Sequence, residues 1–297
     1  MHDLITGGSG FIGRALCQSL LDDGHRVTVL TRSVQRAAAV LPEAAKCVTS
    51  LQTLDDVDAV YNLAGENLAA ERWTAVRKQA FRDSRIGGTD ALVAWMRGLK
   101  RWPAVLVSAS AIGYYGPHDD DLVTEATPPG DDFAARLCVD WEAAALAAQT
   151  LGVRVCTPRI GVVLGTEGGA LAQMLPAFRL GGGGRMGSGR QWMSWIHRAD
   201  LVALLRWLAE TPQAGGAYNA TAPQPVTNAD FARALGRALH RPALLPMPAV
   251  ALKLLFGEMS GLLLTGQRVL PERAHDAGFM FRYATLDAAL ESLLGAP

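Results

Sequence analysis

The 297-residue chain carries 28 Lys and Arg against 28 Asp and Glu, and 49% of its residues are hydrophobic. This composition suits one large domain or two closely packed ones, and the zero formal charge gives no support to nucleic-acid binding. The apolar runs are too short to span a membrane, and the four cysteines lack the C-x-x-C spacing of zinc or redox sites. Because a strand candidate begins almost at Met1, leaving no room for a signal peptide, we expect a cytoplasmic protein without a metal.

The chain opens with a strand candidate, a glycine-rich turn and a helix candidate. Leu4 and Ile5 form the strand, and residues 6–13 read Thr-Gly-Gly-Ser-Gly-Phe-Ile-Gly. Gly7 and Gly10 permit close approaches that a Cβ would prevent, and the free N–H groups at a helix start attract a pyrophosphate. A G-x-G-x-x-G pattern alone is weak, and a tight turn without a ligand is the alternative, but this context favours dinucleotide binding. The residues expected at the cofactor here are Gly7, Ser9, Gly10, Phe11 and Ile12.

Short apolar strands then alternate with amphipathic helices through the first half of the chain. Such strands, separated by helices, predict a parallel sheet covered on both faces. We therefore expect an α/β fold of the doubly wound Rossmann type. The further strand candidates are residues 26–30, 47–49, 59–63, 105–108 and 154–158, and the long helical patterns cover residues 73–99 and 132–150.

The second half of the chain has a different composition and pattern. Glycine-rich loops follow Arg159, and beyond residue 227 the pattern is mostly helical with prolines between the helices. We expect a Rossmann domain over residues 1–220, with a substrate-loop insertion at about 165–195, and a smaller, mainly helical C-terminal lobe over 221–297.

The residues after the second strand candidate bear on the choice of dinucleotide. An acidic residue there would bind the ribose hydroxyls and repel a 2′-phosphate, but this chain has Thr31 and Arg32. Arginine binds phosphate through paired, charge-assisted hydrogen bonds, so the predicted cofactor is NADP (NADPH), with NAD less favoured. The alternative is that Arg32 only begins the next helix at the surface. After the fourth strand, Leu63, Ala64 and Gly65 would let the ribose and pyrophosphate pass close to the backbone.

Several motifs, in this order, resemble the extended short-chain dehydrogenase/reductase family of nucleotide-sugar epimerases and dehydratases. They are found in residues 6–13, 62–65, 108–116, 158–165 and 195–201. The remaining stretch resembles the C-terminal domain, of unknown function, of an atypical epimerase-like subgroup. The resemblance implies NADP(H) binding and a small, anionic carbonyl or nucleotide-sugar-like substrate. It also places Glu66, Arg85, Ser108, Cys138 and Arg159 near the cofactor.

The chain departs from that family at the catalytic dyad. The family uses a tyrosine with a lysine four residues later, whose ammonium lowers the tyrosine pKa toward neutrality. None of the five tyrosines here has such a lysine. By alignment, Ala134 replaces the tyrosine, Cys138 replaces the lysine, and Arg85 lies near the position of a supporting asparagine. The atypical subgroup shows the same replacements.

Four residues remain as catalytic candidates. Ser110, at the end of the fifth strand, would hydrogen-bond a substrate oxygen or simply cap a loop. Tyr114 and Tyr115 would bring a phenol toward the nicotinamide, although packing is the commoner fate of such a pair. Cys138 would need a lowered pKa to react, and its apolar neighbours favour a buried thiol at the nicotinamide ribose instead.

Two charged regions complete the predicted site. Glu66 would act as a base or pair with Arg85, and we favour the ion pair. In the glycine-rich loop before residue 197, Arg185 and Arg190 would hold a substrate phosphate while Trp192 stacks on a base or sugar. The alternative is an ordinary solvated loop, but ordering four consecutive glycines costs entropy, which favours a substrate contact.

Two functions follow from these observations. We favour an NADP-dependent oxidoreductase or epimerase-like enzyme with a small-molecule substrate and no nucleic-acid or membrane partner. The alternative is a non-catalytic NADP(H)-binding sensor or regulatory protein, because losing a general acid/base removes about a hundredfold to ten-thousandfold in rate. Relatives of this fold dimerise through helices corresponding to residues 73–99 and 132–150, so a homodimer is open by analogy.

Overall fold

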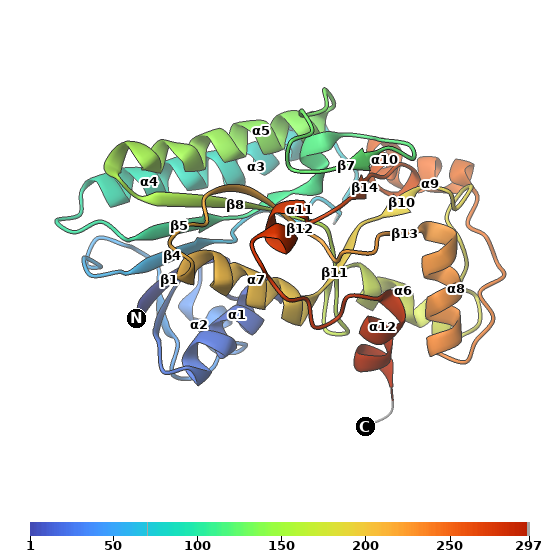
Figure 1. Ribbon diagram of the computed structural model, residues 1–297, viewed down its shortest axis with the longest axis horizontal. Coiled ribbons are helices and arrows are strands. Elements are labelled where there is room, and N and C mark those ends of the chain that lie inside the picture. Colours follow the sequence, from blue (N-terminus) through green and yellow to red (C-terminus); the bar gives the residue numbers. More distant parts are fainter. Residues whose placement is uncertain (70, 296–297) are drawn as a thin grey trace.

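A parallel sheet forms the centre of the computed structural model, which describes residues 1–69 and 71–295 (Figure 1). Its strands are β1 (His2–Thr6), β2 (Arg26–Leu30), β3 (Lys46–Val48), β4 (Ala59–Asn62), β5 (Val105–Ser108), β6 (Ser110–Ala111), β8 (Arg154–Ile160) and β12 (Gly216–Ala220). They run in the order β3-β2-β1-β4-β5-β8-β12, with β6 paired to β8 and every pairing parallel. The order reverses between β1 and β4, the point at which open α/β sheets bind ligands. The expected Rossmann fold is confirmed.

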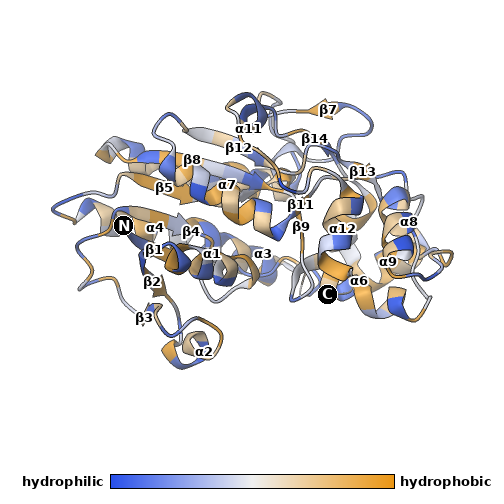
Figure 2. Cartoon of the chain, turned by 60° about the horizontal axis from the view of Figure 1, so that its bottom comes forward, coloured by the Kyte–Doolittle hydropathy of each residue, from blue (hydrophilic) through white to orange (hydrophobic). Residues whose placement is uncertain are grey.

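Helices cover both faces of this sheet (Figure 1). One face carries α1 (Phe11–Asp22), α2 (Val34–Ala38) and α7 (Arg198–Glu210), and the other α3 (Ala75–Arg82), α4 (Gly88–Arg97) and α5 (Phe133–Leu146). Because successive side chains of a strand point to opposite faces, Ile5 packs in the core under α1 and α7, and Leu4 in the core under α4 and α5. Figure 2 shows β5 in hydrophobic colours and α7 with both colours, as expected for a buried strand and a half-buried helix.

The helix predicted over residues 73–99 is wrong in one respect, because it is not a continuous α-helix. A π-helical turn at Asp83–Gly87 separates α3 from α4. Gly87 is the last residue of this turn and Gly88 the first of α4, and the Thr89 hydroxyl donates to the carbonyl of Arg85 at 2.6 Å. Residues with little preference for the α-helix and a competing side-chain bond both favour such a turn. The turn carries Arg85, and so its insertion determines where that guanidinium lies.

A smaller lobe lies beside the sheet, at the carboxyl ends of its strands (Figure 1). Its core joins Leu175 and Trp195 with Phe231, Leu235 and Leu290, which come from widely separated parts of the chain. The predicted division into residues 1–220 and 221–297 remains a prediction, and the lobe core draws on both sides of that boundary. The helices of this part are α6 (Gly169–Arg179), α8 (Asn228–Ala238), α9 (Ala249–Phe256), α10 (Gly261–Leu264) and α12 (Leu286–Leu294). The short helix α11 (Glu272–Asp276) packs instead beside β12, and its Ala274 belongs to the core of the sheet.

Three two-stranded pairs connect the lobe with the rest of the molecule. The strand β9 (Val162–Leu164) pairs in parallel with β11 (Trp195–His197), and β10 (Trp192–Met193) pairs antiparallel with β13 (Val226–Thr227). The third pair joins β7 (Leu122–Val123) to β14 (Arg268–Val269) in parallel. The C-terminal segment therefore returns to the edge of the Rossmann domain.

Within the part of the chain that the structure describes, no helix has both the length and the apolar composition to cross a membrane. The same residues contain no group of three or more His, Cys, Asp and Glu placed to hold a metal ion.

Candidate functional site

The glycine turn after β1 is packed so closely that side chains are excluded from it. Gly7 has φ +70°, and a Cβ there would lie 2.6 Å from the carbonyl oxygen of Leu63. The Thr6 hydroxyl donates to Asn62 Oδ1 at 2.7 Å and accepts from the Ala64 backbone at 3.2 Å. These contacts join the turn after β1 to the loop after β4, so the two predicted cofactor loops lie side by side.

The first turn of α1 presents backbone N–H groups without side-chain caps. Its N-cap is Gly10, whose own N–H donates to the Gly7 carbonyl at 3.0 Å. The N–H groups of Phe11 and Ile12 lie in the first turn, where a helix has no internal acceptors. With the dipole of a twelve-residue helix behind them, they favour an anion at this place. Ser9 is exposed beside them.

The ring of Phe11 is held by a second glycine-rich loop. Cβ atoms at Gly165 and Gly168 would lie 2.6 Å and 2.7 Å from that ring. The Arg198 guanidinium lies 5.0 Å from the ring centre, and Arg198 also pairs with Glu167 at 2.8 Å. The backbone of Phe11 therefore faces the turn, while its side chain packs on residues of the second half of the chain.

The Arg32 side chain is exposed and accessible to a phosphate group. Its side chain is 90% exposed, and its guanidinium contacts Glu66 at 3.2 Å. Ser33, not Arg32, caps the following helix α2, and Thr31 bonds to the β3 edge through its backbone N–H. The Glu66–Arg85 ion pair that we favoured is wrong, because the Glu66 carboxylate turns to Arg32 and, at 3.9 Å, to Arg77.

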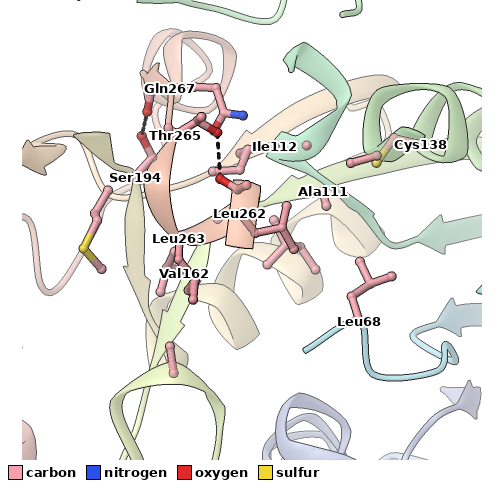
Figure 3. Close-up of a pocket in the computed structure, with 18 of the residues that line it drawn as sticks. Leu68, Ala111, Ile112, Cys138, Val162, Ser194, Leu262, Leu263, Thr265 and Gln267 are labelled. Atoms are coloured by element: carbon pink, nitrogen blue, oxygen red, sulfur yellow. Dashed lines mark hydrogen bonds between the residues drawn. The ribbon is translucent and has the colours of Figure 1, made fainter. Parts of the chain in front are cut away.

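A cavity of about 550 Å³ opens between the cofactor loops and the lobe. Its sheet end is lined by Ile12, Leu63, Ala109, Ser110 and Cys138. Its lobe end is mainly apolar, and the residues there include Met174, Met186, Trp192, Met193, Leu262 and Leu263. In Figure 3 the side chains of Leu262 and Leu263 lie between Leu68 on one side and Ser194 on the other.

A buried polar network extends from this cavity into the protein. The Ser110 hydroxyl donates to Glu142 at 2.6 Å, and Glu142 is held by the Arg159 guanidinium through two bonds of 2.9 Å. Such a bidentate, buried ion pair fixes both partners. Ser110 therefore lines the cavity, whereas Arg159, expected near the cofactor, points its guanidinium to Glu142 on the far side of Ser110.

The two adjacent tyrosines belong to the same network and not to the cavity wall. The Tyr115 hydroxyl donates to Asn219 at 2.5 Å and accepts from Arg159 at 3.0 Å. Burial raises the pKa of Tyr115 to about 12. The Tyr114 ring stacks with its centre 3.4 Å from the Arg159 guanidinium carbon. The structure therefore does not bring either phenol toward the position expected for the nicotinamide.

Cys138 and Ser108 occupy buried positions of different kinds. Cys138 lines the cavity, and burial raises the pKa of its thiol to about 12. It is therefore an uncharged thiol at neutral pH, which agrees with the expectation of an unreactive group. Ser108 accepts from Asn62 at 3.0 Å in the interior of the sheet, and its side chain does not reach the cavity.

Arg85 has no carboxylate partner among the described residues. Its guanidinium packs against Gly65, where a Cβ would lie 3.0 Å away, and it lies 5.2 Å from the Trp141 ring centre. Arg85 lines the cavity, and its Nη1 atom is buried without a hydrogen bond. Burial lowers the pKa of Arg85, but a guanidinium stays charged at neutral pH. An unpaired cation therefore lies at the sheet end of the cavity.

Of the three residues predicted in the glycine-rich loop, Trp192 lines the cavity and the two arginines do not. Arg185 and Arg190 are exposed and do not line it, and Arg185 donates to the Ser188 carbonyl at 3.0 Å. In the same loop, Gly183 packs against the Phe178 ring so closely that a Cβ would collide with it. Besides the predicted Trp192, the loop contributes Met186 and Gln191 to the wall.

Sequence reasoning missed Glu142 and Asn219. Glu142 is a buried carboxylate in an alanine-rich helix, four residues after Cys138 and on the same face. That isolated charge was a usable signal, because a buried carboxylate requires a partner. Asn219 offered no such signal, since its contact with Tyr115 spans 104 residues.

Comparison with known proteins agrees with this geometry. The model of the NAD dependent epimerase/dehydratase family matches residues 4–221. The chain belongs to this family. A second model, of a domain of unknown function (DUF1731), matches residues 247–293. The expected membership in an atypical extended short-chain dehydrogenase/reductase group with such a C-terminal domain is confirmed.

Relatives within the family span almost the whole chain. An epimerase family protein of Mycobacterium tuberculosis is 44% identical over 96% of this chain and 95% of its own length. The chloroplastic SDR39U1 homolog of Arabidopsis thaliana is 42% identical over 98% of this chain and 86% of its own length.

Solved structures extend the comparison. Human epimerase family protein SDR39U1, crystallised with NADPH, is 36% identical with a TM-score of 0.91, and the match covers 99% of both chains. A nucleoside-diphosphate sugar epimerase of Corynebacterium glutamicum is 31% identical with a TM-score of 0.79, over 99% of this chain and 58% of that one. A UDP-galactose 4-epimerase at 18% identity and a TM-score of 0.77 shows the fold alone.

Proposed function

We propose that this epimerase family protein is an NADP(H)-dependent oxidoreductase that acts on a small substrate in the cavity beside the glycine turn. One observation carries the proposal: Ser110, bonded to the buried Glu142, faces a cavity that begins at the cofactor loops. The similarity to human SDR39U1, which is 36% identical and was crystallised with NADPH, supports the choice of cofactor.

The residues at the sheet edge fit such a cofactor. The uncapped N–H groups of Phe11 and Ile12 and the side-chain-free turn at Gly7 would hold the diphosphate. Arg32 would bind the 2′-phosphate, since its guanidinium is exposed next to the end of β2. The loop residues Leu63, Ala64 and Gly65 would pass beneath the ribose. Ser9, Thr31 and Cys138 complete the proposed cofactor contacts.

Ser110 and Glu142 provide a route for the proton. A bound NADP(H) supplies or accepts the hydride. In the oxidising direction, a substrate hydroxyl would give its proton to Ser110 Oγ while Ser110 gives its own proton to Glu142 Oε1, 2.6 Å away. In the reducing direction both transfers are reversed. Arg159 keeps Glu142 in place through its two hydrogen bonds and balances its charge between turnovers.

Turnover of NADPH with a panel of carbonyl compounds tests this function. We expect Ser110→Ala to lower kcat by about a hundredfold, the usual effect of losing one proton-transfer group, while NADPH affinity changes less than threefold. Ser292→Ala, on the exposed face of α12, is the control and should leave both quantities unchanged.

A sensor without turnover is the second candidate function. The observation in its favour is that Tyr115 and Cys138 both have a pKa near 12, so neither exchanges protons readily at neutral pH. Tight NADPH binding with no turnover across the panel would favour the sensor and contradict the enzyme. The cytoplasmic location and the homodimer remain predictions, to be checked by fractionation and by light scattering.

A further inference from the structure

The sheet end and the lobe end of the cavity differ in chemistry. Near Cys138, the cavity wall has the Arg85 guanidinium and the Ser110 hydroxyl. Away from the sheet, the wall consists mainly of leucine, methionine and tryptophan side chains. Figure 3 shows two of the leucines, Leu262 and Leu263. A molecule that fills the whole cavity would therefore have one polar end and one apolar end.

Arg85 is the strongest feature of the polar end. Arg85 as a whole is half-buried, but its Nη1 atom is buried without a hydrogen bond, and the guanidinium has only the face of Trp141 and the backbone of Gly65 beside it. A cation placed in this way without a counter-charge is costly. Glu66, the nearest carboxylate on that loop, is already engaged by Arg32 and Arg77. An anion entering the cavity would gain a charge-assisted, forked hydrogen bond at Arg85.

Most polar side chains at the lobe end already have partners within the protein, and the carboxylate of Glu258, which also lines the cavity, pairs with Lys78 at 2.6 Å. Gln191 donates to the carbonyls of Met186 and Leu263 at 3.0 Å and 2.9 Å. The Ser194 hydroxyl donates to the backbone carbonyl of Gln267 and accepts from the backbone N–H of Val269. Asn228 accepts from the Met186 backbone at 2.7 Å. A sugar or phosphate placed here would lose its water without replacement, whereas an alkyl chain would gain from burial.

The arginines that would suit a nucleotide lie elsewhere. Arg185 and Arg190 are exposed and outside the cavity. Gln267 is the side chain at this end whose amide has no hydrogen-bond partner among the described residues, and it would accept one polar substituent on the chain.

From these contacts we infer that the cavity binds an amphipathic oxo or hydroxy acid. Its carboxylate would pair with Arg85, its reacting oxygen would meet Ser110, and its apolar chain would extend between Leu262 and Met193 of the lobe. The inference rests on the proposed function for the reacting oxygen alone; the carboxylate and chain subsites are properties of binding. A cavity of about 550 Å³ is within the range of small-molecule sites.

Binding of unreactive probes to the NADPH-saturated protein tests the inference without turnover. Decanoate has both the carboxylate and the alkyl chain, decanol has the alkyl chain without a carboxylate, and acetate has the carboxylate without a long chain. By calorimetry we expect decanoate to bind at least tenfold more tightly than decanol and at least a hundredfold more tightly than acetate. Equal affinity for decanoate and decanol, or no binding of decanoate, would overturn the proposal.

Variants at each end identify the subsites. Arg85→Gln should weaken decanoate about tenfold to a hundredfold and decanol less than threefold, and Arg85→Lys should recover part of the loss. Arg82→Gln, which removes a surface partner of Asp140, is the control and should change neither. Leu262→Gln, at a side chain 44% exposed, should weaken decanoate about threefold to tenfold, and Leu254→Gln, 72% exposed on α9, should not.

The outcomes separate this inference from the proposed function. Decanoate binding that depends on Arg85, without turnover of any oxo acid, would support the inference and leave the enzyme proposal contradicted. Turnover of neutral carbonyls without decanoate binding would support the enzyme proposal and contradict the inference. If Arg85→Gln instead lowers NADPH affinity tenfold and leaves decanoate unchanged in the loaded protein, Arg85 serves the cofactor phosphates and the inference is wrong.

Discussion

At the scale of single residues, Arg32 and Glu66 form a surface ion pair at the place where NADP and NAD differ. Their 3.2 Å contact lies beside the end of β2, and the Arg32 side chain remains 90% exposed. The carboxylate would compete with a 2′-phosphate for the same guanidinium. If Arg32 binds the 2′-phosphate as proposed, the pair would influence both the affinity for NADPH and its dependence on salt.

Replacing Arg32 should change cofactor preference selectively. We expect Arg32→Ala to weaken NADPH binding about tenfold to a hundredfold and NADH binding less than twofold, since only NADPH carries the 2′-phosphate. Glu66→Gln should strengthen NADPH binding a few-fold at low salt. Arg190→Ala, an exposed arginine outside the cavity, is the control in calorimetric titrations. Equal losses for NADPH and NADH would refute the assignment of Arg32.

His197 predicts a dependence of stability on pH. Burial lowers its pKa to about 4, and its Nδ1 accepts from the Ala199 backbone at the start of α7. The unfolded histidine binds a proton below about pH 6.5, whereas the folded one does not until about pH 4, so this contribution to stability is lost as the pH falls between these values.

The substitution His197→Asn retains a cap for α7 but removes the titration. Wild-type protein should lose up to about 1.4 kcal/mol of unfolding free energy per pH unit more than the variant in this window. Urea unfolding between pH 7 and pH 4 measures the difference. Parallel curves for the two proteins would show that the histidine is not responsible.

At the scale of elements, the π-helical turn between α3 and α4 is the part of the fold that periodicity could not predict. A run of helical apolar spacing covers both sides of it, and the observed local feature that favours the insertion is the bond from the Thr89 hydroxyl to the Arg85 carbonyl. Gly87 and Gly88 have helical angles, with φ −59° and −64°, and a Cβ at either would meet nothing within 4 Å.

Alanine at these two glycines should therefore stabilise the protein. Each of Gly87→Ala and Gly88→Ala should raise the unfolding free energy by about 0.5–1 kcal/mol through the lower backbone entropy of the unfolded chain. Gly7→Ala is the matched contrast, because φ +70° and the Leu63 carbonyl at 2.6 Å leave no room for a Cβ, and it should destabilise. Thermal melts would decide; destabilisation by Gly87→Ala would mean that the turn requires glycine.

The strands were predictable because their signal is local. Residues 26–30 and 105–108 agree with β2 and β5, since short buried apolar runs have few alternatives. The candidate site was less predictable from the sequence. The Ser110–Glu142 bond and the turning of Arg185 away from the cavity depend on packing between distant segments, which no spacing in the sequence expresses.

At the scale of the whole molecule, Asp200 joins the Rossmann domain to the C-terminal segment. This buried carboxylate on α7 accepts the backbone N–H groups of Arg282 and Tyr283, each at 2.9 Å. Two charge-assisted bonds to otherwise unpaired amides hold the chain before α12 against the sheet side.

Removing that carboxylate should loosen the lobe. We expect Asp200→Ala to lower the unfolding free energy by about 2–4 kcal/mol, because two buried N–H groups lose their acceptor. Asp200→Asn should cost less, since its amide oxygen still accepts one bond. Hydrogen exchange of residues 279–290 should increase more than exchange of β1 and β4. Uniform acceleration in all three segments would contradict a tether.

The composition of the lobe core has a consequence for synthesis on the ribosome. Leucines of α12, near the end of the chain, complete the packing of α6 and α8, whereas the glycine turn and β1 to β5 emerge first. The lobe core can therefore form only after α12 has been synthesised, whereas the segments of the glycine turn and of β1 to β5 are present much earlier.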